Sequence, residues 1–195
     1  MAAIKSALEL ALERTADVKS DKASLESHEN RQKGRKLLSE FFDDPTVNLK
    51  KRLKDFEKPQ RAQIRKGLFE ALLGNLTLPG DENHLARIQS LQPAFEAVLD
   101  DSRHLPMVFD QISNILQQYL RDRKQLVEQL RQQFEGRIRQ REQELARQTG
   151  QQIRLDPSQD PEFAKTLQSH MTQLTDQYQQ VVDQAREQIE SLYKD

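Results

Sequence analysis

Apolar residues recur three or four positions apart along most of this chain, which is the spacing of one face of an α-helix. The pattern is longest in the second half, where residues 106–148 contain a single glycine, Gly136, and after Pro106 no further proline. The seam residues there are Ile112, Leu116, Tyr119, Arg123, Leu126, Leu130, Phe134, Ile138, Arg141 and Leu145. A second row begins after Asp160-Pro161 and comprises Phe163, Leu167, Met171, Leu174, Tyr178, Val181, Ala185, Ile189 and Leu192. These rows predict two long helices, the first ending at Thr149 and Gly150.

The two long helices have complementary surfaces. At 1.5 Å per residue they would be roughly 65 and 50 Å long, and a connection of about ten residues is enough to reverse the chain. The first helix is rich in arginine beyond Tyr119, while the second is acidic on balance, and opposite flanking charges help to set helix pairing. We therefore expect an antiparallel, coiled-coil-like hairpin over residues 106–195 with its tip near 150–160. The alternatives are that each helix pairs in a dimer, and that both charged faces are simply solvated.

The first half predicts shorter helices. An amphipathic helix over residues 4–15 is followed by a break at residues 16–24, and a second helix runs from about Lys22 to Phe42. Asp44 is expected to cap the next helix, with Pro45 in its first turn.

Two more helices are predicted before the hairpin. One begins at Pro59 and ends at Gly74 as a C-cap, and residues 75–81 form a loop. The other lies beyond this loop and must be kinked or divided by Pro93. The chain is thus predicted to be all-α, with an N-terminal arm (1–20), a small helical domain (21–105) and the long hairpin (106–195).

Composition narrows the class of protein. Apolar residues make up 35% and charged residues 31% of the 195 residues, a balance typical either of disorder or of elongated helices with a narrow buried stripe. The helical periodicity favours the second reading. The net charge of −1 provides no overall field toward nucleic acid or an anionic membrane. Because the chain has no cysteine, no signal-like N-terminus and no apolar run of membrane-spanning length, we expect a cytoplasmic protein without membrane insertion.

Candidate chemistry is sparse. The chain has no phosphate-loop, dinucleotide-binding, zinc-protease or nucleophile-elbow motif. Its histidines fall on separate predicted helices or their ends, so their spacing predicts no metal site: His28, His84, His104 and His170. The acidic pairs at 43–44 and 100–101 could hold Mg²⁺ or act as acid and base, but both lie where helices begin or end, and we favour this structural role over a chemical one. The sequence therefore predicts no catalytic residue, no cofactor and a non-enzymatic protein.

Two segments are candidate binding sites. A basic stretch over 50–66 could contact the phosphates of RNA or DNA, or be a solvated or internally paired surface; its residues are Lys50, Lys51, Arg52, Lys54, Lys58, Arg61, Arg65 and Lys66. The N-terminal helix has an apolar face that could dock into a groove of a partner or pack on its own protein: Ile4, Leu8, Ala11 and Leu12.

The segments IKSALELALERTADVKSDKASLE, GQQIRLDPSQDPEF and YQQVVDQAREQI resemble a small family of functionally uncharacterised bacterial proteins, a domain of unknown function. The resemblance implies a bacterial, cytoplasmic, helical protein and assigns no catalytic or binding residue.

The function predicted from sequence is that of a scaffold or adaptor-like protein, acting on one or more protein partners through the hairpin and the N-terminal helix. A homodimer is a further option. The alternative is a nucleic-acid- or ribosome-associated factor that uses the basic stretch.

Overall fold

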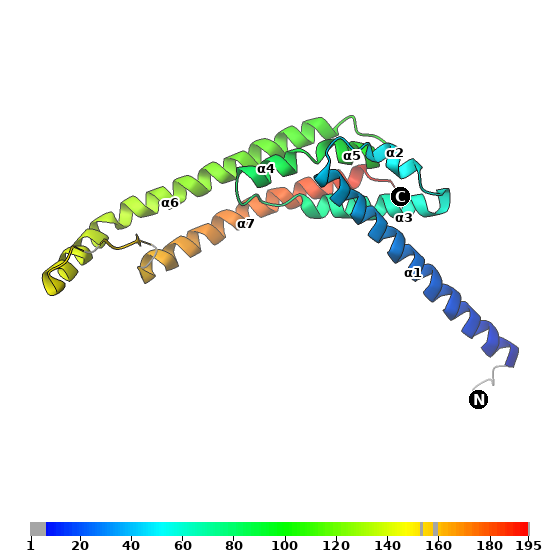
Figure 1. Ribbon diagram of the computed structural model, residues 1–195, viewed down its shortest axis with the longest axis horizontal. Coiled ribbons are helices and arrows are strands. Elements are labelled where there is room, and N and C mark those ends of the chain that lie inside the picture. The colour runs from blue at the N-terminus through cyan, green and yellow to red at the C-terminus, as the bar shows by residue number, and fades with distance from the viewer. Residues whose placement is uncertain (1–6, 153, 158–159, 195) are drawn as a thin grey trace. The chain divides into compact units, whose positions relative to one another are not determined.

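The computed structural model describes residues 7–152, 154–157 and 160–194, with side chains from residue 24 onward (Figure 1). Every regular element in these residues is a helix, which confirms the all-α prediction. The helices are α1 (Ala7–Asp43), α2 (Leu49–Lys54), α3 (Lys58–Asn75), α4 (Glu82–Gln89), α5 (Gln92–Val98), α6 (Leu105–Thr149) and α7 (Pro161–Leu192). No helix in the described residues is both long enough and apolar enough to cross a bilayer.

The break predicted at residues 16–24 was wrong, because α1 is one helix from Ala7 to Asp43. The prediction rested on loss of the apolar pattern. That stretch contains neither glycine nor proline, so no residue in it stops a helix, and a polar segment can continue one.

Two predicted helix ends were also displaced. Asp44 does not cap α2; its carboxylate accepts hydrogen bonds from Thr46, and Asn48 caps α2 by accepting the Lys51 N–H at 2.9 Å. Helix α3 passes through Gly74 and ends at Asn75. The predicted division at Pro93 is confirmed, since α4 ends at Gln89 and Pro93 lies in the first turn of α5.

The described chain forms two compact units. The first contains residues up to Asn75, the segment from Ser90 to Ser102 and the C-terminal residues from Leu192. Its centre is the contact between α1 and α3, where Gly34 and Gly67 let the two backbones approach closely. Buried apolar side chains from α1, α2, α3 and α5 surround this contact, including Leu37, Phe41, Leu53, Ile64, Leu68, Leu72 and Phe95.

The second unit contains residues from Leu76 to Gln89 and from Arg103 to Ser191. In it α6 and α7 are antiparallel: Tyr119 lies against Tyr178 with ring centroids 5.2 Å apart, and Phe134 against Phe163 at 5.5 Å. Residue numbers thus rise along α6 as they fall along the facing stretch of α7. The predicted hairpin is confirmed within one chain.

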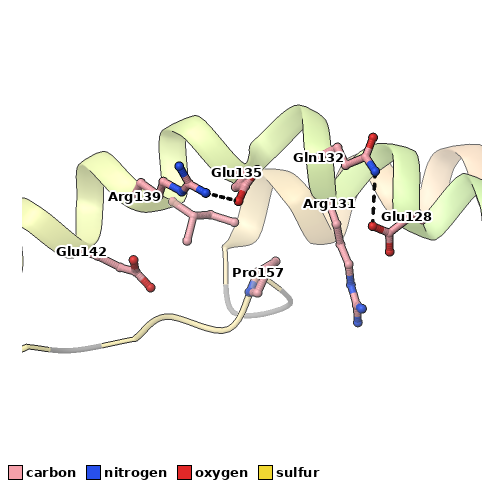
Figure 2. Close-up of a pocket in the computed structure, with 8 residues that line it drawn as sticks. Glu128, Arg131, Gln132, Glu135, Arg139, Glu142 and Pro157 are labelled. Atoms are coloured by element: carbon pink, nitrogen blue, oxygen red, sulfur yellow. Dashed lines mark hydrogen bonds and ion pairs between the residues drawn. The ribbon is translucent and has the colours of Figure 1, made fainter.

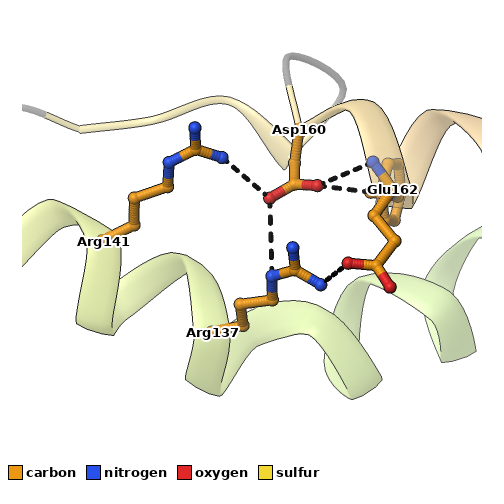
Figure 3. A network of polar contacts seen from close by, with 5 residues as sticks. Arg137, Arg141, Asp160 and Glu162 are labelled. Carbon is orange, nitrogen blue, oxygen red and sulfur yellow. Dashed lines mark hydrogen bonds and ion pairs between the residues drawn. The ribbon is translucent and has the colours of Figure 1, made fainter.

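Both helix ends at the hairpin tip were predicted correctly. Gly150 has φ +70°, and its N–H donates to the Ala146 carbonyl, which closes α6. Asp160 caps α7 by accepting the N–H groups of Glu162 and Phe163. The same carboxylate, only 5% exposed, also accepts from Arg141 and lies beside Arg137, which pairs with Glu162 (Figure 3).

Candidate interaction groove along helix α6

Helix α6 carries a second row of residues beside the row that contacts α7. It consists of Leu120, Lys124, Val127 and Arg131, at spacings of four, three and four, and each lies one residue beyond a member of the first row. Alternation of three and four is the spacing of a helix seam. Helix α6 therefore presents a surface suited to a further helix in addition to the one that it pairs with α7.

This row lies at the base of two adjoining hollows. One, of about 440 Å³, is lined by residues 80–82 and by Leu120, Lys124 and Val127. The other, of about 460 Å³, is lined by Ile138, Glu142 and Pro157 (Figure 2). Both include Glu128 and Arg131, so they form one continuous groove, which we call the α6 groove. From Leu120 to Glu142 it extends for about 33 Å along the helix.

Hydrogen bonds hold the loop at one end of the α6 groove. Arg123 donates to the Gly80 carbonyl at 2.7 Å. The N–H of Gly80 donates to His84 Nδ1 at 3.2 Å, and the Asp81 carboxylate accepts the N–H of His84 at 2.8 Å. The groove wall at residues 80–82 is therefore fixed to both α4 and α6.

The other end is held in a similar way. The Glu142 carboxylate accepts the Leu155 N–H at 2.8 Å, which ties the segment containing Pro157 to α6. Asp160, at the start of α7, returns its N–H to the Pro157 carbonyl at 3.0 Å. Hydrogen bonds to α4, α6 and the start of α7 therefore fix the two backbone segments that bound the α6 groove.

The α6 groove carries charges of both signs. Three of its carboxylates along α6 have partners: Glu128 accepts from Gln132 and Glu135 pairs with Arg139 (Figure 2), and Glu142 accepts the Leu155 N–H. Glu82 also lines the groove. Two of the groove's cations, Lys124 and Arg131, have no side-chain partner within the described residues. They flank Val127, which is partly exposed together with Leu120. The middle of the groove therefore combines accessible apolar surface with two unpaired positive charges.

The surface where α6 meets α7 is different in character. A hollow of about 330 Å³ there is lined mainly by glutamine, with Asp122, Leu126, His170 and Leu174. The Tyr178 hydroxyl donates to Asp122 at 2.5 Å. Burial of the phenol, together with this hydrogen bond and the negative charge of Asp122, raises the pKa of Tyr178 to about 12. This contact joins the two helices of the hairpin.

The basic stretch predicted from sequence is divided between exposed and engaged side chains. Arg52 pairs with Glu40, whose hydrogen bond and charge raise the pKa of the guanidinium. Arg61 donates to the carbonyls at 54 and 56, which lie at the end of α2 and just beyond it, and Arg65 donates to the Val98 carbonyl and to Asp100. Lys66 is half-buried with contacts of its own. Arg52 is exposed as well. Four lysines are exposed and have no side-chain partner in the described residues: Lys50, Lys51, Lys54 and Lys58.

The docking residues predicted in the N-terminal helix lie near the start of the chain. Ile4 lies outside the described residues. Leu8, Ala11 and Leu12 lie in α1, in the part where the structure describes the backbone alone.

The other polar candidates have local contacts. His84 belongs to the loop described above, and His28, His104 and His170 are exposed on separate elements. In the part of the chain that the structure describes, no three His, Asp or Glu side chains gather as a metal site. Hydrogen bonds from the Thr46 hydroxyl and N–H lower the pKa of Asp44, so this carboxylate stabilises a turn.

Sequence reasoning did not identify the α6 groove. The row from Leu120 to Arg131 lies within the arginine-rich arm, and its two cations hide its seam spacing. A search for a second seam, one residue out of step with the first, could have found it. The occupied glutamates and the two bounding segments could not have been found in this way.

A family model matches residues 50–191, and its description is "Family of unknown function (DUF6657)". This chain belongs to that family. The DUF6657 match includes all of the α6 groove and the hairpin up to Ser191, whereas residues 1–49 precede it. No curated protein and no solved structure matched the chain.

Proposed function

We propose that this member of the DUF6657 family is a non-enzymatic interaction protein that binds a segment of another protein along the α6 groove. The carrying observation is the unpaired Lys124 and Arg131 on either side of the partly exposed Val127. Apolar surface bordered by charge is typical of sites that bind a helical segment. The fixed segments at both ends would reduce the ordering that binding costs.

The arrangement favours recognition over catalysis. Catalysis requires ionisable groups that converge on one reacting atom. In the α6 groove, the polar side chains come mainly from one helix and lie in rows along it, so that they would contact a ligand over its length. The role of scaffold or adaptor is consistent with a long hairpin surface of this kind.

A photo-crosslinking experiment tests this function. The full chain, expressed at its native level, would carry a photoreactive residue at Val127 or, as a control, at Gln140, an exposed α6 residue that does not line the groove. We expect protein adducts from position 127 that are absent from position 140. Val127→Asp should remove the same partners from a pull-down at an unchanged melting temperature. Equal adducts from both positions, or full retention of partners by Val127→Asp, would contradict the proposal.

The exposed lysines of α2 and the start of α3 support a second candidate function, phosphate-driven binding of RNA or DNA. Lys50, Lys51, Lys54 and Lys58 project into solvent within a short stretch of chain. Such binding should weaken steeply as salt is raised. Titration of mixed RNA and DNA into the wild-type chain and a variant with all four lysines changed to glutamine, at about 50 mM salt, tests it. Identical curves for the two proteins would eliminate this candidate.

A further inference from the structure

We infer that two copies of this chain associate through the hollow between α6 and α7, with α6 of each copy lying against α7 of the other. The hollow has a volume of about 330 Å³ and is formed by residues 122–129 of α6 and 170–177 of α7. It shares no residue with the described lining of the α6 groove, so association there goes beyond the proposed function and is independent of it.

The base of the hollow is apolar surface that the hairpin leaves incompletely buried. Leu126 and Leu174 lie there, one from each helix, and both are partly exposed. Elsewhere on the same two helices, the seam residues Leu116 and Ile189 are fully buried. Two helices alone cannot enclose a seam on every side, and an apolar stripe is stable when a further element covers it. A layer packed over the hollow would complete the burial of both leucines.

The rim of the hollow is made of neutral amides. Four exposed glutamines form it, two from each helix, and their side chains have no partner in the described residues: Gln125, Gln129, Gln173 and Gln177. Asp122 also lines the hollow, and its carboxylate already accepts from the Tyr178 hydroxyl and the Gln118 amide. His170 completes the lining. A covering layer must therefore supply hydrogen-bond donors and acceptors rather than counter-charges.

A second copy of the same hollow meets both requirements. A glutamine side chain donates from its NH₂ group and accepts at its carbonyl oxygen, so amides that face one another can bond in either order. The two copies would also bring their leucines together over a centre without unpaired carboxylates, as is usual in interface cores. The described lining holds no lysine or arginine, so a nucleic acid is not suited to it. A patch that complements itself favours a twofold dimer.

Charge along the helices sets the orientation of the two copies. Over 118–137, α6 carries five basic and three acidic residues, whereas the facing stretch of α7, 163–182, carries one of each. A twofold axis parallel to the helices places α6 of one copy on α7 of the other, and so keeps the two basic stretches apart. It also keeps each residue at its own level along the hairpin. Gln129 of one copy therefore faces Gln173 of the other.

The available surface is large enough for a dimer of modest strength. These stretches are about 30 Å long, and two neighbouring helices together are about 20 Å wide. The two copies would thus cover about 1,200 Å² in all, which is at the lower end for specific interfaces. We therefore expect monomer and dimer to be in equilibrium at micromolar concentrations.

Sedimentation equilibrium of the full chain, whose monomer has a mass of 22.7 kDa, provides the test. We expect the wild type to dimerise at micromolar concentrations. The double variants Gln129→Glu, Gln173→Glu and Gln129→Lys, Gln173→Lys should each dimerise about tenfold more weakly, because like charges then face one another. An equimolar mixture of these two variants should restore association, which misfolded proteins could not do.

The matched control changes exposed glutamines of α6 and α7 outside the hollow, Gln148→Glu with Gln168→Glu, and should dimerise as the wild type does. Cysteine crosslinking tests the orientation, since the chain contains no cysteine of its own. When Gln129→Cys and Gln173→Cys proteins are mixed, we expect disulfides between the two variants in preference to disulfides within either one.

Three results would overturn the inference. A wild-type chain that stays monomeric at these concentrations, or a Glu variant that dimerises as tightly as the wild type, would remove the dimer. Preferential crosslinking of the Gln129→Cys protein to itself would show that α6 meets α6, contrary to the orientation inferred. Val127→Asp changes the α6 groove alone and should leave the dimer intact, so that failure of the dimer and failure of the proposed function are distinguishable.

Discussion

Two glycines decide how closely α1 and α3 approach. A Cβ atom placed on Gly34 would lie 2.1 Å from the Ile64 carbonyl oxygen, and one on Gly67 would lie 2.3 Å from the Arg31 carbonyl oxygen. Both obstacles are backbone atoms, which cannot move aside as the end of a side chain can. The helices therefore meet backbone to backbone at this point, and even a methyl group would separate them.

Gly34→Ala and Gly67→Ala should each lower the free energy of unfolding by about 1–3 kcal/mol, the usual range for overpacking. Gly74 and Gly136 are the controls, since a Cβ at either would meet nothing within 4 Å. In a helix, alanine is favoured over glycine by up to about 1 kcal/mol, so the control variants should be as stable as the parent or more so. Urea denaturation of the four variants measures these free energies of unfolding. Equal destabilisation of all four would contradict the close contact.

The raised pKa of Tyr178 predicts that the folded protein loses stability at alkaline pH. Its pKa of about 12 in the folded chain exceeds the usual value of 10.0, so the folded state holds this proton more tightly than the unfolded state. The resulting stabilisation is complete below pH 10 and is lost as the pH rises toward 12. Absorbance titration of the wild-type chain should resolve a tyrosine with this raised pKa. Tyr178→Phe should remove it, and Asp122→Asn should lower its pKa.

At the scale of secondary-structure elements, the start of α7 depends on Asp160. This buried carboxylate both caps the helix and lies against Arg141 and Arg137 of α6. It thus joins the beginning of one helix to the side of the other. Glu162 pairs with Arg137 in an exposed position, where an ion pair contributes little.

Asp160→Ala should lower stability by about 1–3 kcal/mol, because it removes the cap and leaves two arginines without their shared partner. Asp160→Asn should cost less, since asparagine also caps helices. Glu162→Gln should change stability by less than about 1 kcal/mol. Hydrogen exchange in the first turn of α7 should rise in the same order. A larger effect at Glu162 than at Asp160 would refute this ranking.

The elements also show where sequence reasoning succeeded. Helix periodicity identified α6 and α7, and the local chemistry of Gly150 and Asp160 gave their facing ends. It failed at residues 16–24, where a change in polarity was mistaken for a helix end. It failed again at Asp44 and Gly74, which are residue types favoured at helix ends, because Asn48 caps α2 and α3 continues through Gly74 to Asn75.

For the whole molecule, the two compact units are not successive stretches of sequence. The chain passes between them at 75–76, 89–90, 102–103 and 191–192. The last residues therefore complete the first unit. There Tyr193 stacks on Phe69 with ring centroids 4.1 Å apart and lies 4.9 Å beneath the Arg65 guanidinium. Arg65 also donates to the Lys194 carbonyl at 3.0 Å.

Tyr193→Ala should therefore destabilise the protein by about 1–3 kcal/mol, through lost apolar burial and ring stacking. Lys194→Ala is the matched control, because the atom that accepts from Arg65 is a backbone oxygen that alanine retains. Thermal unfolding of both variants provides the measurement. A melting temperature for Tyr193→Ala equal to that of Lys194→Ala would show that the C-terminal contact does not stabilise the first unit.

The sequence by itself determined the all-α class, the antiparallel hairpin and both helix ends at its tip. These follow from periodicity and from capping, which depend on residues close together in the chain. Tertiary structure alone decided the backbone contact at Gly34 and Gly67, the return of Tyr193 to Phe69, and the bounding of the α6 groove by residues 80–82 and Pro157. Each joins positions far apart along the chain, and no local pattern specifies which distant partner a residue meets.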